Sequence, residues 1–410
     1  MDDRPIRVLL DVSPVCAPES ARTGLARVAL QLATALERDP GVELSVIAWG
    51  WVQAAFDLEA ALSRAPVRLR IACAKPGAIE RAFSRSWTKH RTHGRVPGWL
   101  VRAGQALNTL RNPVRGLNPD SFDVVHSTFS RVPGSVRRWG KPVVITLHDV
   151  APLKLGGGVP RSQVAIMRRI IGGVSPSDWI VPISRNTQRD FEEVASSHRD
   201  NRVCVIPNAV DRDVFRPLGD PGRADGVRRA HGIPTGPFFL TISSLAPHKN
   251  VRFLLDLWPE VRRKHPDATL VVAGGKTTDR AALESEFGTG AGVHFTGYVS
   301  DDALAVMLSR CEAFLFPSLY EGFGLPILEA MACGAPVIAS DRTAIPEVVG
   351  EAATLLDPTE PGEWVAAIAA AISTGPRKSV HEPSIHRASL FDWGAVAAGY
   401  VALYRRALQS

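Results

Sequence analysis

Two glutamates, Glu321 and Glu329, lie on either side of a turn of glycines and one proline in the segment 318–340, which reads SLYEGFGLPILEAMACGAPVIAS. An apolar run, AFLFPS, precedes the turn, and a helix is predicted to begin at Pro326 and to stop at Gly334. Proline is common at a first helical position, and glycine is common just past a helix end. The N–H groups at such a helix start carry an effective charge of roughly +0.5, which favours a phosphate or diphosphate.

The two carboxylates require a different partner, because a diphosphate would repel them. Hydroxyl groups can donate hydrogen bonds to a carboxylate, and Gly322 and Gly324 let a ligand approach the backbone closely. A nucleotide-diphosphate sugar combines a diphosphate with hydroxyl groups on both its ribose and its transferred sugar. The segment therefore indicates a site for such a donor.

Short β-branched runs alternate with helical patterns along the whole chain. The runs cover residues 7–12, 42–49, 122–128, 142–150, 179–184 and 202–208 in the first half, and 238–244, 268–275, 293–298, 313–318, 336–340 and 353–358 in the second. Strands separated by helices predict parallel sheets covered on both faces. The segment 217–237, dense in Pro, Gly and charge, is predicted to be a linker with one short helix.

We therefore expect an α/β fold of two Rossmann-like, doubly wound domains that face each other across a cleft. Ligands of such sheets bind outside the carboxyl ends of the strands. The predicted domains are residues 1–215 on the acceptor side and residues 216–390 on the donor side. The helix at 391–410 is expected to pack back on the first domain.

Composition excludes several classes of protein. The chain has 410 residues, 45% of them hydrophobic and 22% charged, which is typical of globular domains. It contains no run of 18 apolar residues, and its start, MDDRPIRVLLDV, lacks the basic and then apolar order of a signal peptide, so a cytoplasmic protein is expected. Five cysteines without a CxxC pair suggest neither a disulfide framework nor a zinc site.

The segment EGFGLPILE (321–329) resembles the E-x7-E signature of the retaining, GT-B-type glycosyltransferases, a large family of bacterial polysaccharide, lipopolysaccharide and mannosyl transferases often called family 4. The likeness extends over nearly the whole chain. It includes RTGLARVALQLATAL (22–36), ITLHDV (145–150), VIPNAVD (205–211), PHKN (247–250) and FDWGAVAAGYVALYRRAL (391–408). Each match alone is weak, whereas their common order and spacing are specific.

The resemblance implies a role for each matching residue. In this family the second glutamate of the signature binds ribose hydroxyls and the first contacts the transferred sugar, which implies these roles for Glu329 and Glu321. Lys249 would be the cationic partner of the donor diphosphate. His148 would reach the donor sugar from the opposite lobe, with Asp149 as a helper. The remaining donor-binding residues would be Ser243, Ser244, Gly322, Phe323, Gly324, Leu325, Gly24 and Tyr298.

One departure concerns the phosphate site. Many relatives have an arginine in a Gly-Arg pair before the lysine, where this chain has Ser243-Ser244. Either Lys249 alone neutralises the diphosphate or another arginine reaches the site.

The resemblance implies a retaining glycosyltransferase that moves a hexosyl group to a hydroxyl of a saccharide or lipid-linked glycan, in cell-surface polysaccharide or lipopolysaccharide synthesis. The form SSLAPHKN resembles relatives that use GDP-mannose. Neither a metal nor a cofactor is expected. The alternatives are a nucleotide-sugar epimerase or hydrolase on the same fold, and a nucleotide-sugar-binding subunit without catalysis.

Three other motifs do not support competing functions. VVAGGKTT (271–278) cannot be a P-loop, because Leu270 stands where the first glycine is required. The GFG tripeptide is an incomplete dinucleotide fingerprint that lies late in the chain. The DRD tripeptide (211–213) imitates a metal-binding DxD motif but lies in the connection between the predicted domains.

The segment 81–116 contains eight Lys or Arg residues and no Asp or Glu. Phe83, Trp87 and Trp99 lie among these cations. Mixed aromatic and basic residues are typical of helices that bind an anionic membrane surface. We therefore expect a peripheral protein on the inner face of the cytoplasmic membrane, with a lipid-linked acceptor and no nucleic-acid partner.

Overall fold

The computed structural model describes residues 4–16, 24–49, 58–59, 61–63, 65–72, 82–84, 86, 99, 103–104, 112–156, 159–195, 202–274, 280–287, 289–373 and 380–410. Most of the basic segment 81–116, and with it the predicted membrane-binding surface, lies outside the described residues. No helix in the described part of the chain is long and apolar enough to cross a membrane.

Lobe 1, residues 4–195, is built on a parallel sheet. Its described strands are β1 (Ile6–Asp11), β2 (Val42–Ile47), β3 (Val124–Ser127), β4 (Val143–Leu147) and β5 (Trp179–Pro182). They lie in the order β2-β1-β3-β4-β5. These strands are short and largely buried, as expected where helices cover both faces of a parallel sheet. The prediction of a strand over 202–208 was wrong, since only an isolated bridge joins Val203 to Ile180.

Helices connect the strands of lobe 1. They are α1 (Ser13–Cys16), α2 (Gly24–Arg38), α6 (Gly134–Arg137), α7 (Ala151–Lys154), α8 (Arg161–Ile171) and α9 (Arg185–Val194), with the 3₁₀ turn η2 (Pro119–Ser121). The buried residues of α2 recur at helical spacing, so one face of this helix packs on the sheet.

Lobe 2, residues 220–389, contains a second parallel sheet. Its described strands are β6 (Phe238–Ile242), β7 (Thr269–Ala273), β8 (Val293–Gly297), β9 (Phe314–Phe316), β10 (Val337–Ser340) and β11 (Thr354–Leu356). They lie in the order β11-β10-β9-β6-β7-β8. The order reverses between the neighbouring strands β6 and β9, and doubly wound sheets bind their ligands at such a switch point. The expected α/β fold of two Rossmann-like domains is confirmed.

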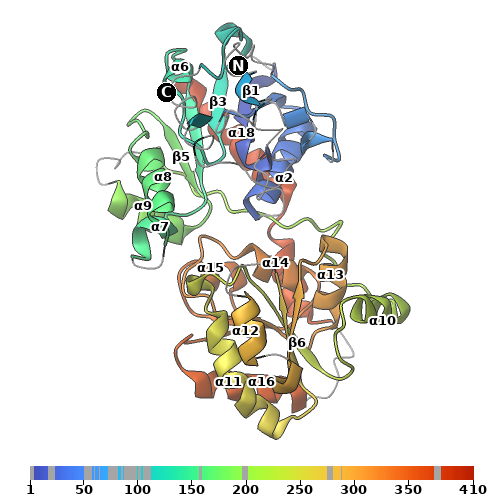
Figure 1. The fold of residues 1–410 in the computed structure, drawn as a ribbon. Helices are drawn as coiled ribbons and strands as arrows, with labels where there is room; N and C mark the ends of the chain where they lie inside the picture. Colours follow the sequence, from blue (N-terminus) through green and yellow to red (C-terminus); the bar gives the residue numbers. More distant parts are fainter. Residues whose placement is uncertain are drawn as a thin grey trace.

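The helices of lobe 2 lie around this sheet (Figure 1). They are α10 (Pro221–Ala230), α11 (Val251–Lys264), α12 (Arg280–Phe287), α13 (Asp301–Arg310), α14 (Leu325–Ala332), α15 (Ile345–Val349), α16 (Pro361–Ser373) and α17 (Glu382–Ser389), with the 3₁₀ turns η3 (Pro247–Lys249) and η4 (Thr289–Ala291). Helix α10 is the short helix predicted within the segment 217–237.

The last helix, α18 (Trp393–Gln409), leaves lobe 2 and packs against α2 and β3 of lobe 1 (Figure 1). A chain of buried polar groups fixes it there. His126 on β3 bonds through Nδ1 to the Tyr404 hydroxyl at 2.7 Å and through Nε2 to Thr146 Oγ1 at 2.8 Å. Thr146 Oγ1 lies 2.7 Å from the hydroxyl of Tyr400. The two tyrosines of α18 are thus tied to the core of the first sheet.

This network predicts a loss of stability in acid. Burial lowers the pKa of His126 to about 3, whereas an unfolded histidine has a pKa near 6.5. Below pH 6.5 the unfolded chain therefore binds a proton that the folded chain excludes, which destabilises the fold by about 2 kcal/mol at pH 5. Urea unfolding at pH 7 and pH 5 should show that His126→Asn, although less stable at pH 7, loses about 2 kcal/mol less on acidification than the wild type. Equal losses in the two proteins would contradict the account.

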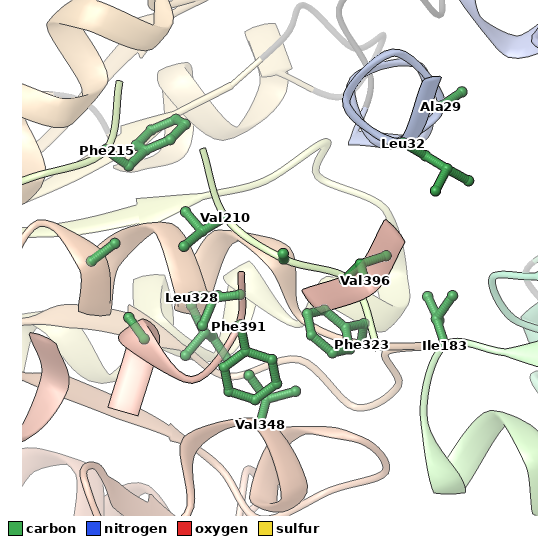
Figure 2. Packing of buried hydrophobic residues seen from close by; sticks show 14 of the residues in the cluster. Ala29, Leu32, Ile183, Val210, Phe215, Phe323, Leu328, Val348, Phe391 and Val396 are labelled. Atoms are coloured by element: carbon green, nitrogen blue, oxygen red, sulfur yellow. The ribbon is translucent and has the colours of Figure 1, made fainter. Parts of the chain in front are cut away.

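One cluster of buried apolar residues runs through both lobes. Figure 2 shows Leu32 of α2 in this cluster together with Phe323, Leu328 and Phe391. The ring of Phe323, a predicted donor-site residue, is 4% exposed and packs edge-on against Phe391, with 5.8 Å between the ring centroids. The Phe323 side chain therefore anchors the turn before α14 in the apolar core.

Candidate active site

Lys249 and Glu321 meet at the switch point of the second sheet. Strand β6 leads to η3, which ends at Lys249, and β9 leads to the signature turn, residues 318–325. Lys249 Nζ lies 2.7 Å from Glu321 Oε1, and the two side chains are only 23% and 9% exposed. The structure thus joins the residues assigned by resemblance to the diphosphate and to the transferred sugar.

The start of α14 faces the start of α2 across the lobes. Gly324 has φ +103°, a left-handed conformation that favours glycine, and α14 begins at Leu325, one residue before the predicted start. Among the described residues no side chain caps this end. A Cβ on Gly24, the first residue of α2, would lie 3.9 Å from Leu325 Cδ2. The starts of two helices, each of which favours an anion, therefore lie close together.

Glu329, on α14, is held by a cation of lobe 1. Arg27 Nη2 lies 2.8 Å from Glu329 Oε1, and Arg27 Nη1 lies 3.1 Å from Asp301 Oδ1 at the start of α13. Burial raises the pKa of Glu329 to about 7, and the Arg27 guanidinium opposes this shift. The carboxylate assigned to ribose therefore already has a charged partner from the opposite lobe.

The signature turn packs directly on the end of β4. A Cβ on Gly322 would lie 2.1 Å from the carbonyl oxygen of His148 and 2.8 Å from Asp149 Cβ, so only glycine fits between the lobes here. Thr187 on α9 donates a hydrogen bond of 3.1 Å to the carbonyl oxygen of Gly322. The predicted His-Asp pair and the signature turn are thus in contact.

His148 is neutral in this position. Its Nε2 lies 2.8 Å from the carbonyl oxygen of Thr128 and must donate the hydrogen, which leaves Nδ1 as an acceptor. Burial lowers the pKa of His148 to about 4, and its ring lies edge-on to Phe129. A neutral imidazole of this tautomer can accept a hydrogen bond from a sugar hydroxyl.

Asp149 lies within the field of the Lys249–Glu321 pair. Burial raises the pKa of Asp149, the Ala151 N–H that its Oδ1 accepts at 2.9 Å lowers it, Glu321 raises it further and Lys249 lowers it. An aspartate with a raised pKa is suited to proton transfer.

Three other predicted site residues take no part in the ion pairs that engage Lys249 and the signature glutamates. Ser243 Oγ accepts the N–H of Leu245 at 2.8 Å, so this hydroxyl shapes the turn after β6. Ser244 is exposed. Tyr298, which is 52% exposed, lies near enough to Arg27 to influence its pKa.

Arg27 was not predicted as a site residue. The sequence did contain a signal for a functional arginine, because Arg27 is a charged residue in the otherwise apolar first two turns of α2. Two contacts that join the lobes were also not predicted. The Tyr320 hydroxyl donates to Asp190 Oδ2 at 2.7 Å, and the Glu347 carboxylate accepts the N–H groups of Arg185 and Asn186 at the start of α9.

A cavity of about 670 Å³ lies beside these contacts, lined largely by α9 and by residues around α15. Its described lining contains neither Lys249 nor the two signature glutamates. Those three side chains are instead engaged in ion pairs.

The DRD tripeptide has structural contacts. Asp211 Oδ2 accepts the side-chain amide of Gln31 at 2.6 Å, and Asp211 Oδ1 accepts the N–H of Asp213 at 3.1 Å. In the part of the chain that the structure describes, no cluster of three or more His, Cys, Asp or Glu residues could hold a metal ion.

Comparisons with known proteins match both halves of the chain. The family model of glycosyltransferase family 4 matches residues 22–214, and that of the glycosyl transferases group 1 matches residues 225–383. The D-inositol 3-phosphate glycosyltransferase of Acidothermus cellulolyticus is 30% identical over 315 residues, which cover 71% of this chain and 68% of that protein. The O-antigen chain mannosyltransferase B of Escherichia coli is 28% identical over 69% of this chain and 75% of its own.

Solved structures show the same fold. HepE of Anabaena, in complex with UDP and glucose, has a TM-score of 0.65 and 18% identity over 97% of this chain and 98% of its own. WaaG, a glycosyltransferase involved in lipopolysaccharide biosynthesis, has a TM-score of 0.62 and 16% identity over 97% and 98% of the two chains.

Proposed function

The chain belongs to the GT-B glycosyltransferases of group 1 and family 4. We propose that it transfers a hexosyl group from a nucleotide-diphosphate sugar to a hydroxyl of a saccharide or lipid-linked glycan. The anomeric configuration of the transferred sugar is retained. The observation that carries the proposal is the ion pair of Lys249 Nζ with Glu321 Oε1, 2.7 Å apart, on a signature turn that also packs against the His148-Asp149 pair.

The first requirement of such a reaction is to stabilise the leaving diphosphate. Lys249 would exchange the Glu321 carboxylate for the diphosphate, and the N–H groups at the start of α14 would add their partial positive charge. Preorganised groups of this kind often contribute several kcal/mol to the transition state. Many relatives have an arginine of a Gly-Arg pair beside the phosphates. Here Arg27 is paired with Glu329 and Asp301, so we assign the neutralisation of the diphosphate to Lys249.

The second requirement is to hold the transferred sugar as it gains positive charge. Glu321 and the free acceptor Nδ1 of His148 would bind its hydroxyls, while Glu329 binds the ribose. Retention then follows from attack on the face of the leaving group, so that no enzymic nucleophile forms a covalent intermediate. The departing diphosphate takes the proton of the acceptor hydroxyl, with Asp149 as a helper.

Mannose from GDP-mannose is the donor that we propose, in cell-surface polysaccharide or lipopolysaccharide synthesis. The form SSLAPHKN and the similarity to an O-antigen chain mannosyltransferase support this choice. Thermal-shift measurements with GDP, UDP, dTDP and ADP test it, because a ligand that binds only the folded state raises stability by RT ln(1 + [L]/Kd). GDP should give the largest shift, and no shift with any nucleotide would contradict the proposed donor site.

The reaction is proposed to need no metal ion, because Lys249 and the start of α14 supply the positive charge at the diphosphate. Transfer should therefore be unchanged in excess EDTA. Activity that EDTA abolishes and Mn²⁺ or Mg²⁺ restores would contradict this prediction.

We also propose, from the sequence of the basic segment 81–116, that the enzyme binds the cytoplasmic membrane face peripherally. Each cation near an anionic surface contributes about 1 kcal/mol. Co-sedimentation with phosphatidylglycerol vesicles should weaken as salt rises, and a variant with Arg85, Lys89, Arg91 and Arg95 changed to Ser should bind less. Equal binding to neutral vesicles, or no loss in the variant, would remove this anchor.

A further inference from the structure

The backbone around the Lys249–Glu321 pair is strained. In the described part of the chain, the non-glycine residues with positive φ are Leu245 at +60°, Asn250 at +54° and Thr343 at +53°. Asparagine tolerates this conformation, whereas for a β-branched residue such as threonine it is a genuine outlier. Such residues persist only where their surroundings hold them, and they concentrate at functional sites.

Two of these residues flank the turn that carries Lys249, and the third bonds to Glu321. Leu245 and Asn250 stand before and after the segment that ends at Lys249. The Asn250 side chain donates to the carbonyl oxygen of Pro358 at 3.1 Å. Thr343 lies far along the chain, after β10, and its Oγ1 accepts the N–H of Glu321 at 2.9 Å. Positive φ angles therefore occur on both sides of the turn that carries Lys249 and at the residue that bonds to the Glu321 backbone.

Thr343 is the unusual member of the three, because it is β-branched. Glycine would adopt the same backbone conformation without strain. Glycine, however, has no hydroxyl. The Thr343 hydroxyl is the partner that the structure gives to the N–H of Glu321, and the neighbouring Gly322 is packed against the carbonyl oxygen of His148 with no space for a side chain. Two contacts from different elements therefore fix consecutive residues of the turn.

We propose that Thr343 is a positioning residue. Its left-handed backbone places its hydroxyl within hydrogen-bond distance of the Glu321 N–H, and this bond holds the Glu321 carboxylate beside Lys249. This inference rests on the proposed function for its effect on turnover. Its structural part, the fixing of the signature turn, does not depend on the reaction.

Three variants separate positioning from strain. Thr343→Ser keeps the hydroxyl, Thr343→Val keeps the shape and the strain but loses the hydroxyl, and Thr343→Gly loses both. If the strain had no function, Thr343→Gly would be at least as stable and as active as the wild type. If Thr343 positions Glu321, kcat should fall roughly 10- to 100-fold in the Val and Gly variants, and Ser should restore it.

The expected pattern also includes binding and stability. Nucleoside diphosphate affinity should stay within about threefold in all variants, because Glu329 and α14 are unchanged, and Thr343→Gly should match or exceed the melting temperature of the wild type. A Gly variant with full kcat, or a Ser variant as slow as Val, would overturn the proposal.

Hydrogen exchange of a peptide over residues 318–325 keeps the two proposals distinguishable. The amide of Glu321 should exchange faster in the Val and Gly variants than in the wild type and in Thr343→Ser. If the wild type transfers no sugar, the proposed function fails, and the exchange pattern alone then supports or overturns the fixing of the turn. Equal exchange in all four proteins would overturn it.

Discussion

Glu321→Gln should lower the rate of sugar transfer by roughly 10²- to 10³-fold while leaving nucleotide affinity nearly intact. The substitution keeps the size of the side chain and removes its charge. Glu321 lies against Lys249 and beside the His148-Asp149 pair, where the transferred sugar is proposed to bind. Because Lys249 loses a competing carboxylate, affinity for a nucleoside diphosphate should not fall. Single-turnover rates and calorimetric titration measure the two effects.

Glu329→Ala supplies the opposite case. It removes the acceptor proposed for the ribose hydroxyls and one of the two carboxylates that hold Arg27, so nucleotide affinity itself should fall about 10- to 100-fold. Glu363→Gln, at an exposed position in the first turn of α16, is the matched control and should behave as the wild type. Equal losses of nucleotide affinity in Glu321→Gln and Glu329→Ala would contradict the assigned roles.

Lys249→Met should have the second large effect. Loss of the cation should weaken nucleoside diphosphate binding and lower kcat/KM by roughly 10²-fold or more, since the leaving charge is then less well stabilised. Binding of the nucleoside without phosphate should not change, and Lys249→Arg should recover part of the diphosphate affinity. Calorimetry with the nucleoside and its diphosphate measures the difference.

A control is needed because Lys249→Met leaves the nearly buried Glu321 carboxylate without its cation, which destabilises the fold. The double variant Lys249→Met with Glu321→Gln removes both charges and should regain stability. It should still bind the diphosphate as weakly as Lys249→Met. Recovery of diphosphate affinity in the double variant would show that the single variant had failed only through its stability.

Much of the donor lobe could be predicted from the sequence because its signals are local. The apolar strand before the signature turn, the glycines within it and the proline after it each restrict the backbone, and they agree on a helix that starts at the sheet edge. The structure places that start at Leu325 and not at Pro326. The predicted strand over 202–208 failed because Pro207 lacks a backbone N–H and only one bridge forms beside the edge strand β5.

The contacts between the two lobes could not be predicted in the same way. Arg27 and Glu329 are distant in the sequence, and only the approach of the two lobes makes them an ion pair. Thr343 is harder still, since the conformational preference of threonine argues against the left-handed backbone that it adopts. Sequence patterns report local preferences. Tertiary contacts bring Arg27 and Glu329 together, and they hold Thr343 in a conformation that its local preference disfavours.

Anomeric ¹H NMR of GDP-mannose, incubated in excess EDTA with and without a saccharide or lipid-linked saccharide acceptor, tests the central claim most directly. We expect rapid loss of the donor only when the acceptor is present, release of GDP, and a product with the same anomeric configuration as the donor. A product of inverted configuration would contradict the retaining mechanism. Equal consumption of the donor without acceptor would indicate a hydrolase or epimerase and would contradict the proposed transfer.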